Sequence, residues 1–550
     1  MQRLRNVFFP MLLASALSPG LFANPVIFPH AIVNAASFQA VGLPSGSIAQ
    51  GSVFTIFGAA MGPASAAQQS AFPLQNSFSG VTILVTQGST SVNAIPLFVS
   101  AGQINALMPS NTPLGWVSLR LTFQNSPSNP SPVYIVHDSP GIFTFTGAGL
   151  GPAAAQNVLS ATSLPNNSNQ SSVQPGQSVV LYLTGLGPIA GPDNMAPPAG
   201  TLPTPVEVWV GGEPAQVVYS GRSPCCSGLD QINFTVPPGA PAGCWTPLWV
   251  RTSHATISNF TSIAVSNQNG ACADASNLFT GTVLHGGAIG ELALTRITVH
   301  EDLGVNAPVD ITNDFVSYAV AGQKGGPYAF TPWYSAPPPG TCTVYQGNGD
   351  FLATGAPQLP AGAPLDGGSQ VTVAGSGSPQ TVTLGGGGAA PLGSYLSLYS
   401  FPNQLFLTPG SYTANTSGGA DIGPLKIPVT IPNPLTWTNR DQTVMVPRTQ
   451  PLTVNWTGTT AAQAVAIFGV ASDLPTNSSA IFQCYAPPGS STFTVPPEIL
   501  GALPASRAHA LWSKDVIYVI ASNATAFTAT GLASAAGSAV YATGKTVAFQ

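Results

Sequence analysis

A strand-like motif occurs twice in this chain of 550 residues, and the repeat restricts the folds that its first half can adopt. The stretch DQINFTVP (230–237) has a near copy in GQINALMP (102–109), and Gln103 and Gln231 lie 128 positions apart. Apolar residues alternate with polar ones in both copies, which is the period of a strand with one buried face. Each copy ends on a proline, which lacks the N–H needed to continue a hydrogen-bonded ladder. The motif is therefore predicted to be a strand and its end, not a catalytic site.

Three further pairs of segments repeat in the same order, with offsets between 125 and 129 positions. They are GSVFTIFG (51–58) with GQSVVLYLTG (176–185), VTILV (81–85) with VEVWV (206–210), and GWVSLRLTF (115–123) with GCWTPLWVRT (243–252). The last pair aligns Trp116 with Trp245. Four ordered repeats indicate an internal duplication of roughly 120 residues per unit. About seven short β segments per unit, separated by turn residues, are typical of an immunoglobulin-like sandwich.

The duplicated region also resembles a known family. The segments that carry the resemblance are AIVNAASF, GSVFTIFG, FPLQNSFSGVTILV, GQINALMP, SPGIFTF, VVLYLTGLGP and DQINFTVP. Over about residues 31–266 they resemble the Solibacter-type C-terminal domain of secreted acidobacterial proteins, which is similar to the IPT/TIG class of immunoglobulin-like modules. That family has no established activity, so the resemblance implies a fold and a surface setting but no functional residues. This chain differs in placing the module near its N-terminus and in the Cys225-Cys226 insertion.

The predicted fold class is all-β, with about four tandem immunoglobulin-like β-sandwich domains, of which the first two are the duplication. Only 6% of the residues are charged, and the 59 glycines and 54 prolines are interpreted as punctuation between short strands. A hydrophobic fraction of 44% is enough to fill several cores. The expected divisions are a signal peptide (1–23), sandwich domains at 24–145 and 146–266, a linker (267–290), and sandwich-like domains at 291–432 and 433–550.

The N-terminus predicts export. Arg3 and Arg5 precede an apolar run from Val7 to Leu17, and small residues follow up to Ala23, which is the order of a secretory signal peptide. No later stretch reaches the roughly 18–20 apolar residues that a spanning helix needs. A secreted, cell-surface or periplasmic protein without a membrane span in its mature chain is expected.

Six cysteines in an exported chain predict disulfides. Neighbouring cysteines seldom pair, because a relaxed bridge holds its Cα atoms about 4.4–6.8 Å apart in a suitable orientation. Cys225 and Cys226 are therefore expected to reach Cys244 and Cys272, in an order that the sequence leaves open. No C-x-x-C motif is present, which disfavours zinc.

No set of residues in the sequence proposes a catalyst. The chain contains neither a G-x-S-x-G nucleophile elbow nor an H-E-x-x-H zinc motif, and its 18 acidic residues are well spread. The glycine run at 385–388 lacks the Gly-Lys-Ser/Thr of a phosphate loop and is interpreted as a turn. The 13 Lys and Arg residues are scattered, which argues against nucleic acid as a partner. The chain is predicted not to be an enzyme.

Two segments remain as candidate ligand sites. The acidic cluster HEDLGVNAPVDITND could supply oxygen ligands to calcium, the one cofactor that the sequence suggests, although a solvated turn is the simpler interpretation. The carboxylates concerned are Glu301, Asp302, Asp310 and Asp314. Trp333 and Tyr334, beside a proline run, could bind a sugar or peptide, or could instead belong to a buried core.

The leading functional hypothesis is a structural, adhesive or matrix-binding role at the cell surface, with a surface or matrix protein as partner. The alternative is an extracellular glycan partner, in a protein that captures polysaccharide and is accessory to an enzyme. The two differ in whether aromatic side chains form an exposed planar row or are buried. The residues in question are Trp333, Tyr334, Trp437 and Trp512.

Overall fold

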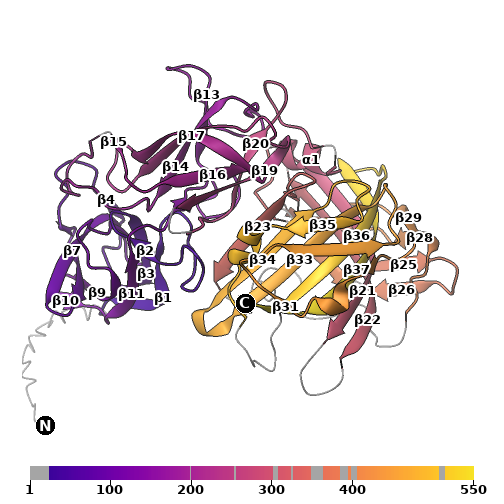
Figure 1. The fold of residues 1–550 in the computed structure, drawn as a ribbon. Helices are drawn as coiled ribbons and strands as arrows, with labels where there is room; N and C mark the ends of the chain where they lie inside the picture. The colour runs from indigo at the N-terminus through magenta and orange to yellow at the C-terminus, as the bar shows by residue number, and fades with distance from the viewer. Residues whose placement is uncertain are drawn as a thin grey trace, which may run out of the picture.

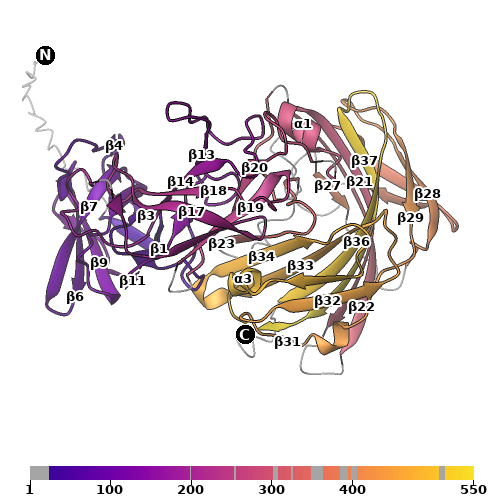
Figure 2. The same ribbon diagram turned by 45° about the horizontal axis from the view of Figure 1, so that its top comes forward.

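The computed structural model describes residues 24–550 apart from 199, 253–255, 275, 302–307, 324–325, 333, 349–362, 384–393, 398–404 and 507–514. The described residues form strands joined by turns, with two short α-helices, α1 (Thr280–His285) and α3 (Pro497–Gly501), which confirms the all-β class. Figures 1 and 2 show three bodies in chain order: unit 1, unit 2 and a larger C-terminal module. The predicted signal peptide at 1–23 lies outside the described residues.

Unit 1 is a sandwich whose strands follow the order β1-β3-β8-β7-β6-β9-β11-β2. Strand β7 belongs to both sheets, because it pairs with β8 in one and with β6 in the other. Its core is a cluster of buried aliphatic residues around Phe54 and Ile104. The strands are β1 (Val26–Asn34), β2 (Ile48–Ala49), β3 (Val53–Ala59), β4 (Ala67–Gln68), β5 (Ser77–Phe78), β6 (Val81–Gln87), β7 (Thr90–Val99), β8 (Gln103–Leu107), β9 (Gly115–Phe123), β10 (Ser126–Pro127) and β11 (Ser131–Val136).

Unit 2 repeats this order as β12-β14-β18-β17-β16-β19-β20. Its core is a second cluster, centred on Leu181 and Phe234. The strands are β12 (Gly141–Ile142), β13 (Ala155–Val158), β14 (Ser178–Thr184), β15 (Gly200–Thr201), β16 (Val206–Val210), β17 (Glu213–Arg222), β18 (Asp230–Thr235), β19 (Gly243–Thr252) and β20 (Thr261–Val265).

The two Q-I-N strands occupy the same place in the two units, as predicted. Strand β8 lies between β3 and β7, and β18 lies between the corresponding β14 and β17. In both units the first residue of the motif bonds to the third: the Gln103 amide donates to Asn105 Oδ1 at 2.9 Å, and Gln231 donates to Asn233 Oδ1 at 2.9 Å. The motif is a repeated element of the fold.

The predicted separation of a third domain (291–432) from a fourth (433–550) is wrong. One sheet runs across the boundary in the order β23-β34-β33-β36-β37-β21-β22-β24. Strand β21 pairs in parallel with β37 from Ile289↔Ser534 to His300↔Lys545, so its partner comes from the far end of the chain. Pairing at this sequence distance leaves no local signal, because each strand alone has the same alternating pattern.

Among the described residues, three smaller sheets complete the C-terminal module, and one of them is the two-stranded pair of β31 with β38. Strands β26-β25-β28-β29 share a core with β21, β22 and β37, and strands β30-β32-β35 share a core with β33, β34 and β36. The strands are β21 (Gly287–Glu301), β22 (Val309–Gln323), β23 (Cys342–Asn348), β24 (Ala363–Pro364), β25 (Gln370–Ala374), β26 (Gln380–Thr383), β27 (Ser394–Ser397), β28 (Gly410–Thr416), β29 (Lys426–Ile431), β30 (Thr436–Trp437), β31 (Met445–Val446), β32 (Leu452–Thr457), β33 (Ala464–Asp473), β34 (Ser478–Tyr485), β35 (Thr492–Val495), β36 (Val516–Ala526), β37 (Ser534–Thr546) and β38 (Ala548–Phe549).

The segment predicted as a linker (267–290) packs against both of its neighbours. Cys272 forms a disulfide with Cys244 of β19, and α1 buries Val283 and Leu284. These residues join Trp245 of unit 2 in one apolar cluster with Ile289 of the C-terminal module. The segment is therefore part of the joint between the two bodies.

Candidate functional site

The joint between units 1 and 2 is built around a buried ion pair. Arg222, at the end of β17, and Asp230, at the start of β18, are 3% and 0% exposed, with Nε and Oδ1 3.3 Å apart. The guanidinium reaches across the joint and donates to the carbonyl oxygens of Gly51 (2.7 Å) and Gly187 (2.8 Å). Asp230 accepts a hydrogen bond from the Leu186 N–H at 2.8 Å. Burial raises the pKa of Asp230 to about 6, and the nearby Arg222 charge only partly opposes this rise.

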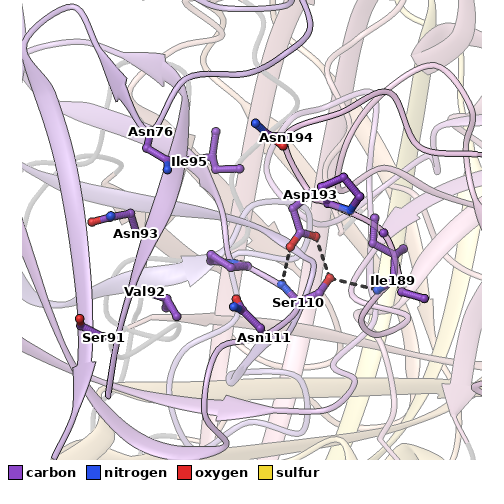
Figure 3. Close-up of a pocket in the computed structure, with 14 residues that line it drawn as sticks. Asn76, Ser91, Val92, Asn93, Ile95, Ser110, Asn111, Ile189, Asp193 and Asn194 are labelled. Atoms are coloured by element: carbon purple, nitrogen blue, oxygen red, sulfur yellow. Dashed lines mark hydrogen bonds between the residues drawn. The ribbon is translucent and has the colours of Figure 1, made fainter. Parts of the chain in front are cut away.

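Beside this joint is a cleft of about 640 Å³ between β7, the turn after β8, and the loop at 189–194 (Figure 3). Asp193 accepts from the Ser110 N–H and hydroxyl, both at 2.7 Å. The Ser110 hydroxyl in turn accepts from the Ile189 N–H at 3.0 Å. Four asparagines and two serines line the cleft among apolar residues and glycine, and its one carboxylate, Asp193, holds unit 2 to Ser110 of unit 1. The cleft can form hydrogen bonds but has no histidine, cysteine or lysine among its described lining residues.

The joint between unit 2 and the C-terminal module is aromatic. Trp209 of β16 stacks on Trp249 of β19, with ring centroids 5.2 Å apart and planes at 3°. Trp249 belongs to the same buried cluster as Trp437 and Trp456 of the C-terminal module. Arg251 lies over the Trp209 ring and donates to Glu498 Oε1 of α3 at 3.1 Å. The outer face of β16 and β19 is thus covered.

The corresponding outer face of unit 1 is exposed. We call it the open face and define it by residues of β6, β9 and β11 with the residue that precedes β9: Leu84, Leu114, Trp116, Ser118, Arg120 and Tyr134. Trp116 is 60% exposed and Tyr134 43%. Their rings lie edge to face across the strand pair, with centroids 5.2 Å apart. The alternation of GWVSLRLTF turns Val117, Leu119 and Leu121 into the core, so the same pattern turns Trp116 outward.

A hollow of about 310 Å³ adjoins the open face where unit 1 meets unit 2. Tyr134 and Leu114 line it from unit 1, and Thr256 lines it from unit 2. His137 and Asp138 also line it, with His137 Nδ1 3.2 Å from Asp138 Oδ2. Ser47 and Ser139 add hydroxyl groups. The hollow therefore combines an aromatic wall with polar side chains.

Of the aromatic residues considered as ligand-binding candidates, Tyr334 is buried, which is the buried-core alternative that the sequence left open. It packs with Trp245 in the apolar cluster at the joint between unit 2 and the C-terminal module, and its hydroxyl donates to Glu291 Oε2 at 2.9 Å. Burial and the adjacent Glu291 carboxylate raise its pKa. Trp437 is buried as well, while Trp333 and Trp512 lie outside the described residues. The exposed pair, Trp116 and Tyr134, was missed, although alternation within β9 was a signal that could have found it.

Two carboxylates of the predicted calcium cluster pair with different arginines, Asp314 with Arg296 and Asp310 with Arg440. Asp314 receives two hydrogen bonds from Arg296, at 2.7 and 2.8 Å, and two more from the N–H groups of Phe406 and Leu407. Asp310 faces Arg440 at 3.1 Å and His300 Nδ1 at 2.9 Å. Asp302 lies outside the described residues, and Glu301 ends β21. Within the described part of the chain, no group of three or more His, Cys, Asp or Glu residues is arranged to hold a metal ion.

The disulfides differ from the predicted pairing. Cys225 bonds to its neighbour Cys226, Cys244 bonds to Cys272, and Cys342 bonds to Cys484. The prediction that Cys244 bonds to Cys225 or Cys226 is wrong, because the two vicinal cysteines lie in an exposed turn between β17 and β18. Cys244 lies instead on β19, where the segment containing Cys272 packs.

Comparison with known proteins adds little to this description. No protein-family model matches the chain, and neither does any curated protein. Domains 4–9 of the surface layer protein SbsC align over 94% of this chain and 65% of that fragment, with 12% identity and a TM-score of 0.17. Titin domains A164–A165 align over 40% of this chain and 92% of theirs (8%, 0.12), and ICAM-5 domains D1–D4 over 89% and 94% (11%, 0.12). These TM-scores are too low to support a role, and the fold class rests on the strand order.

The described residues contain no helix that is long and apolar enough to cross a membrane.

Proposed function

We propose that this chain is an exported, non-catalytic scaffold with a structural or adhesive role at the cell surface. The observation that carries the proposal is that both joints between its bodies are locked by buried contacts. An enzyme that closes on its substrate needs a hinge of a few residues that absorb the motion. Here the joints are held by the buried Arg222 guanidinium, which donates to the Gly51 carbonyl of unit 1, and by Trp249, which packs with Trp437 and Trp456 of the C-terminal module.

The contact between units 1 and 2 is close as well as polar. Gly228, in the turn after Cys226, adopts a φ of +77°, and a Cβ there would lie 2.6 Å from Val53 and 2.7 Å from Leu107 of unit 1. The carbonyl of Gly228 accepts from the Thr184 hydroxyl, which itself accepts from the Val53 N–H at 2.9 Å. The backbone of unit 2 therefore rests directly on the core strands of unit 1.

Unit 1 is also tied to the rest of the chain at a second point. Ser45 of unit 1 donates to the Ile257 carbonyl of unit 2 at 2.5 Å, and the Gln39 amide bonds to Gln346 of the C-terminal module. Contacts at two separate points restrict rotation about either one. A chain held in this way suits a spacer that fixes the distance and angle between surfaces.

The extracellular setting is supported by chemistry. Disulfides persist in oxidising compartments, and all six cysteines of this chain are paired. The resemblance of residues 31–266 to a module of secreted proteins favours the same location. The Cys244–Cys272 bridge holds the segment that joins unit 2 to the C-terminal module. In an exported protein such a connecting segment is exposed to proteases.

The test combines localisation with shape. Antibody labelling of intact cells of the encoding organism should detect the protein at the surface, and deletion of its gene should weaken attachment of the cells. Small-angle scattering of the mature chain should fit one rigid shape, and Arg222→Ala should increase the radius of gyration, while Lys426→Ala at an exposed cation should not. A cytoplasmic protein with reduced thiols, or a wild-type chain whose scattering requires freely moving bodies, would contradict the proposal.

A further inference from the structure

The internal duplication provides a comparison between two equivalent surfaces of one chain. Leu84 of β6 pairs with Arg120 of β9 in unit 1, and Trp209 pairs with Trp249 at the same place in unit 2. Trp116 corresponds to Trp245 by the same register. The outer face of unit 2 buries Trp245 and Trp249 against the C-terminal module, whereas the open face of unit 1 leaves Trp116 in solvent.

The two faces differ in the residues that would make a dry protein contact. In unit 2 the positions around Trp245 hold Trp249, Pro247 and Ala264, and the side chains there are buried. In unit 1 the same positions hold Arg120, Ser118 and Tyr134. Hydrogen-bonding groups thus separate the apolar ones. A face built to dock another β module would resemble unit 2, and the open face does not.

An exposed tryptophan beside polar groups suits a ligand that presents apolar C–H groups and hydrogen-bonding groups on the same side. Large apolar side chains that are exposed together as one patch often mark an interaction site, whereas single exposed apolar residues are common on any protein surface. Leu84 and Leu114 are 42% and 53% exposed and flank the Trp116–Tyr134 pair. A pyranose ring presents C–H groups that pack on an aromatic face and hydroxyl groups that bond to polar neighbours.

The hollow beside the open face extends this surface to the interface between units 1 and 2. Its wall includes Tyr134, so the aromatic pair and the hollow form one continuous surface that ends at Thr256 of unit 2. Arg120 carries the one formal charge among the residues that define the open face. In the hollow, His137 faces Asp138 at 3.2 Å, so a charge on the imidazole would be countered locally. This balance favours a neutral ligand over an anionic one.

We propose that the open face and the adjoining hollow bind a neutral extended glycan. Sugar rings stack on Trp116 and Tyr134, and their hydroxyl groups bond to Ser118 on the face and to the hydroxyls of Ser47 and Thr256 in the hollow. The Gln87 amide donates to the carbonyls of Leu114 and Trp116, at 2.8 and 3.1 Å, and holds the start of β9 in place. This binding site goes beyond the scaffold role and does not depend on it.

The test uses the full mature chain and four neutral probes: cellohexaose, xylohexaose, mannohexaose and chitohexaose. Binding is measured by titration calorimetry and by the change in tryptophan fluorescence. At least one probe should bind, and Trp116→Ala should weaken that binding at least tenfold, with Tyr134→Ala weakening it by a smaller factor. Phe145→Ala is the matched control, because Phe145 is an aromatic residue that is 52% exposed and neither belongs to the open face nor lines the hollow. Trp116 lies on the surface, so its variant should fold normally.

Failure to bind any of the four probes overturns the proposal, and so does full retention of binding by Trp116→Ala. Sedimentation of the wild-type chain distinguishes a protein partner from a glycan. Self-association that Trp116→Ala abolishes, without glycan binding, would assign the open face to a second copy of the chain. Glycan binding could be observed together with small-angle scattering that shows independently moving bodies. That result would support the glycan site and contradict the scaffold role.

Discussion

Asn129 and Ile27 form a two-point contact that Asn259 and Ile142 repeat in the second unit. In unit 1 the asparagine accepts from the isoleucine N–H at 2.9 Å and donates to its carbonyl at 3.1 Å. In unit 2 the same two distances are 2.8 and 3.0 Å. Each asparagine follows a serine whose hydroxyl accepts from a backbone N–H of the neighbouring strand. A short Ser-Asn pair thus fixes the first strand of each sandwich.

The two asparagines should not contribute equally to stability. Asn259 is buried and also donates to the Gly149 carbonyl at 2.7 Å, whereas Asn129 is exposed. Asn259→Ala leaves buried backbone groups without partners, which should cost about 1–3 kcal/mol, and Asn129→Ala should cost about 1 kcal/mol or less, because water replaces the side chain. Thermal unfolding of the full chain, with hydrogen exchange at Ile27 and Ile142, measures both. Equal losses would mean that the repeated contact does not act through burial.

The joint between units 1 and 2 should weaken as the pH rises through about 6. The folded-state pKa of Asp230 is raised from 3.8 to about 6, so the folded chain binds more protons than the unfolded chain between these values. Stability from this group is therefore fully present below about pH 4 and is lost as the pH rises through 6. The shift corresponds to about 3 kcal/mol.

Asp230→Asn is the variant that checks this pH dependence. It removes the titrating group, so urea midpoints of the variant should vary less between pH 4.5 and pH 7 than those of the wild type. Asp193→Asn is the control, because Asp193 bridges the same two units but is only partly buried. A wild-type midpoint that rises with pH in this window would show that the Arg222 charge outweighs burial.

The sequence predicted the parts of the fold that leave a local pattern. Alternation and terminal prolines identified the two Q-I-N strands, and the ordered offsets identified the duplication. The parallel pairing of β21 with β37 has no such pattern, so residues 291–550 were wrongly divided into two domains. A strand shows the same alternation whichever strand it pairs with, so a partner at the far end of the chain cannot be identified from local pattern.

The candidate site was predicted less well, because exposure depends on what covers a face. Trp116 and Trp245 occupy equivalent positions and have the same strand pattern, yet one is exposed and the other buried by a module that follows in the chain. Tyr334 was named for its place beside a proline run, and that segment packs into the joint. Alternation can indicate that the Trp116 side chain points away from the core of unit 1. It cannot indicate whether a later segment of the chain covers that face.

The three disulfides should rank in stability by the length of the loop that each closes, because the entropy that a bridge removes from the unfolded chain rises with the logarithm of loop length. In the chain-entropy model, the Cys244–Cys272 loop of 28 residues corresponds to about 4 kcal/mol and the Cys342–Cys484 loop of 142 residues to about 5 kcal/mol. The Cys225–Cys226 bridge closes almost no loop and should contribute little by this mechanism. Paired serine substitutions, compared by urea unfolding, measure the order. Peptide mapping without reduction checks the pairing itself, and a Cys244 peptide linked to Cys225 or Cys226 would contradict it.

The two sandwich cores fill equivalent space with their large side chains on different strands. In unit 1 Phe54 of β3 lies opposite Ala106 of β8, and in unit 2 Val179 of β14 lies opposite Phe234 of β18. All four side chains are fully buried. The larger residue has changed strands between the units, as expected where the total core volume is kept. This exchange makes the Q-I-N strand testable as a packing element.

Phe234→Ala should destabilise the chain by about 3–5 kcal/mol, because it leaves a cavity in the core of unit 2. Asn233→Ala, on the opposite side of the same strand, should cost only about 0.5–1.5 kcal/mol. Adding Val179→Phe to Phe234→Ala restores the arrangement that unit 1 uses and should recover part of the loss, although Val179→Phe alone should be destabilising through overpacking. A double-mutant cycle measured by urea unfolding of the full chain gives this coupling. Simple additivity of the two changes would mean that the two cores are not built on the same plan, and a stable Phe234→Ala chain would remove the packing role of the motif.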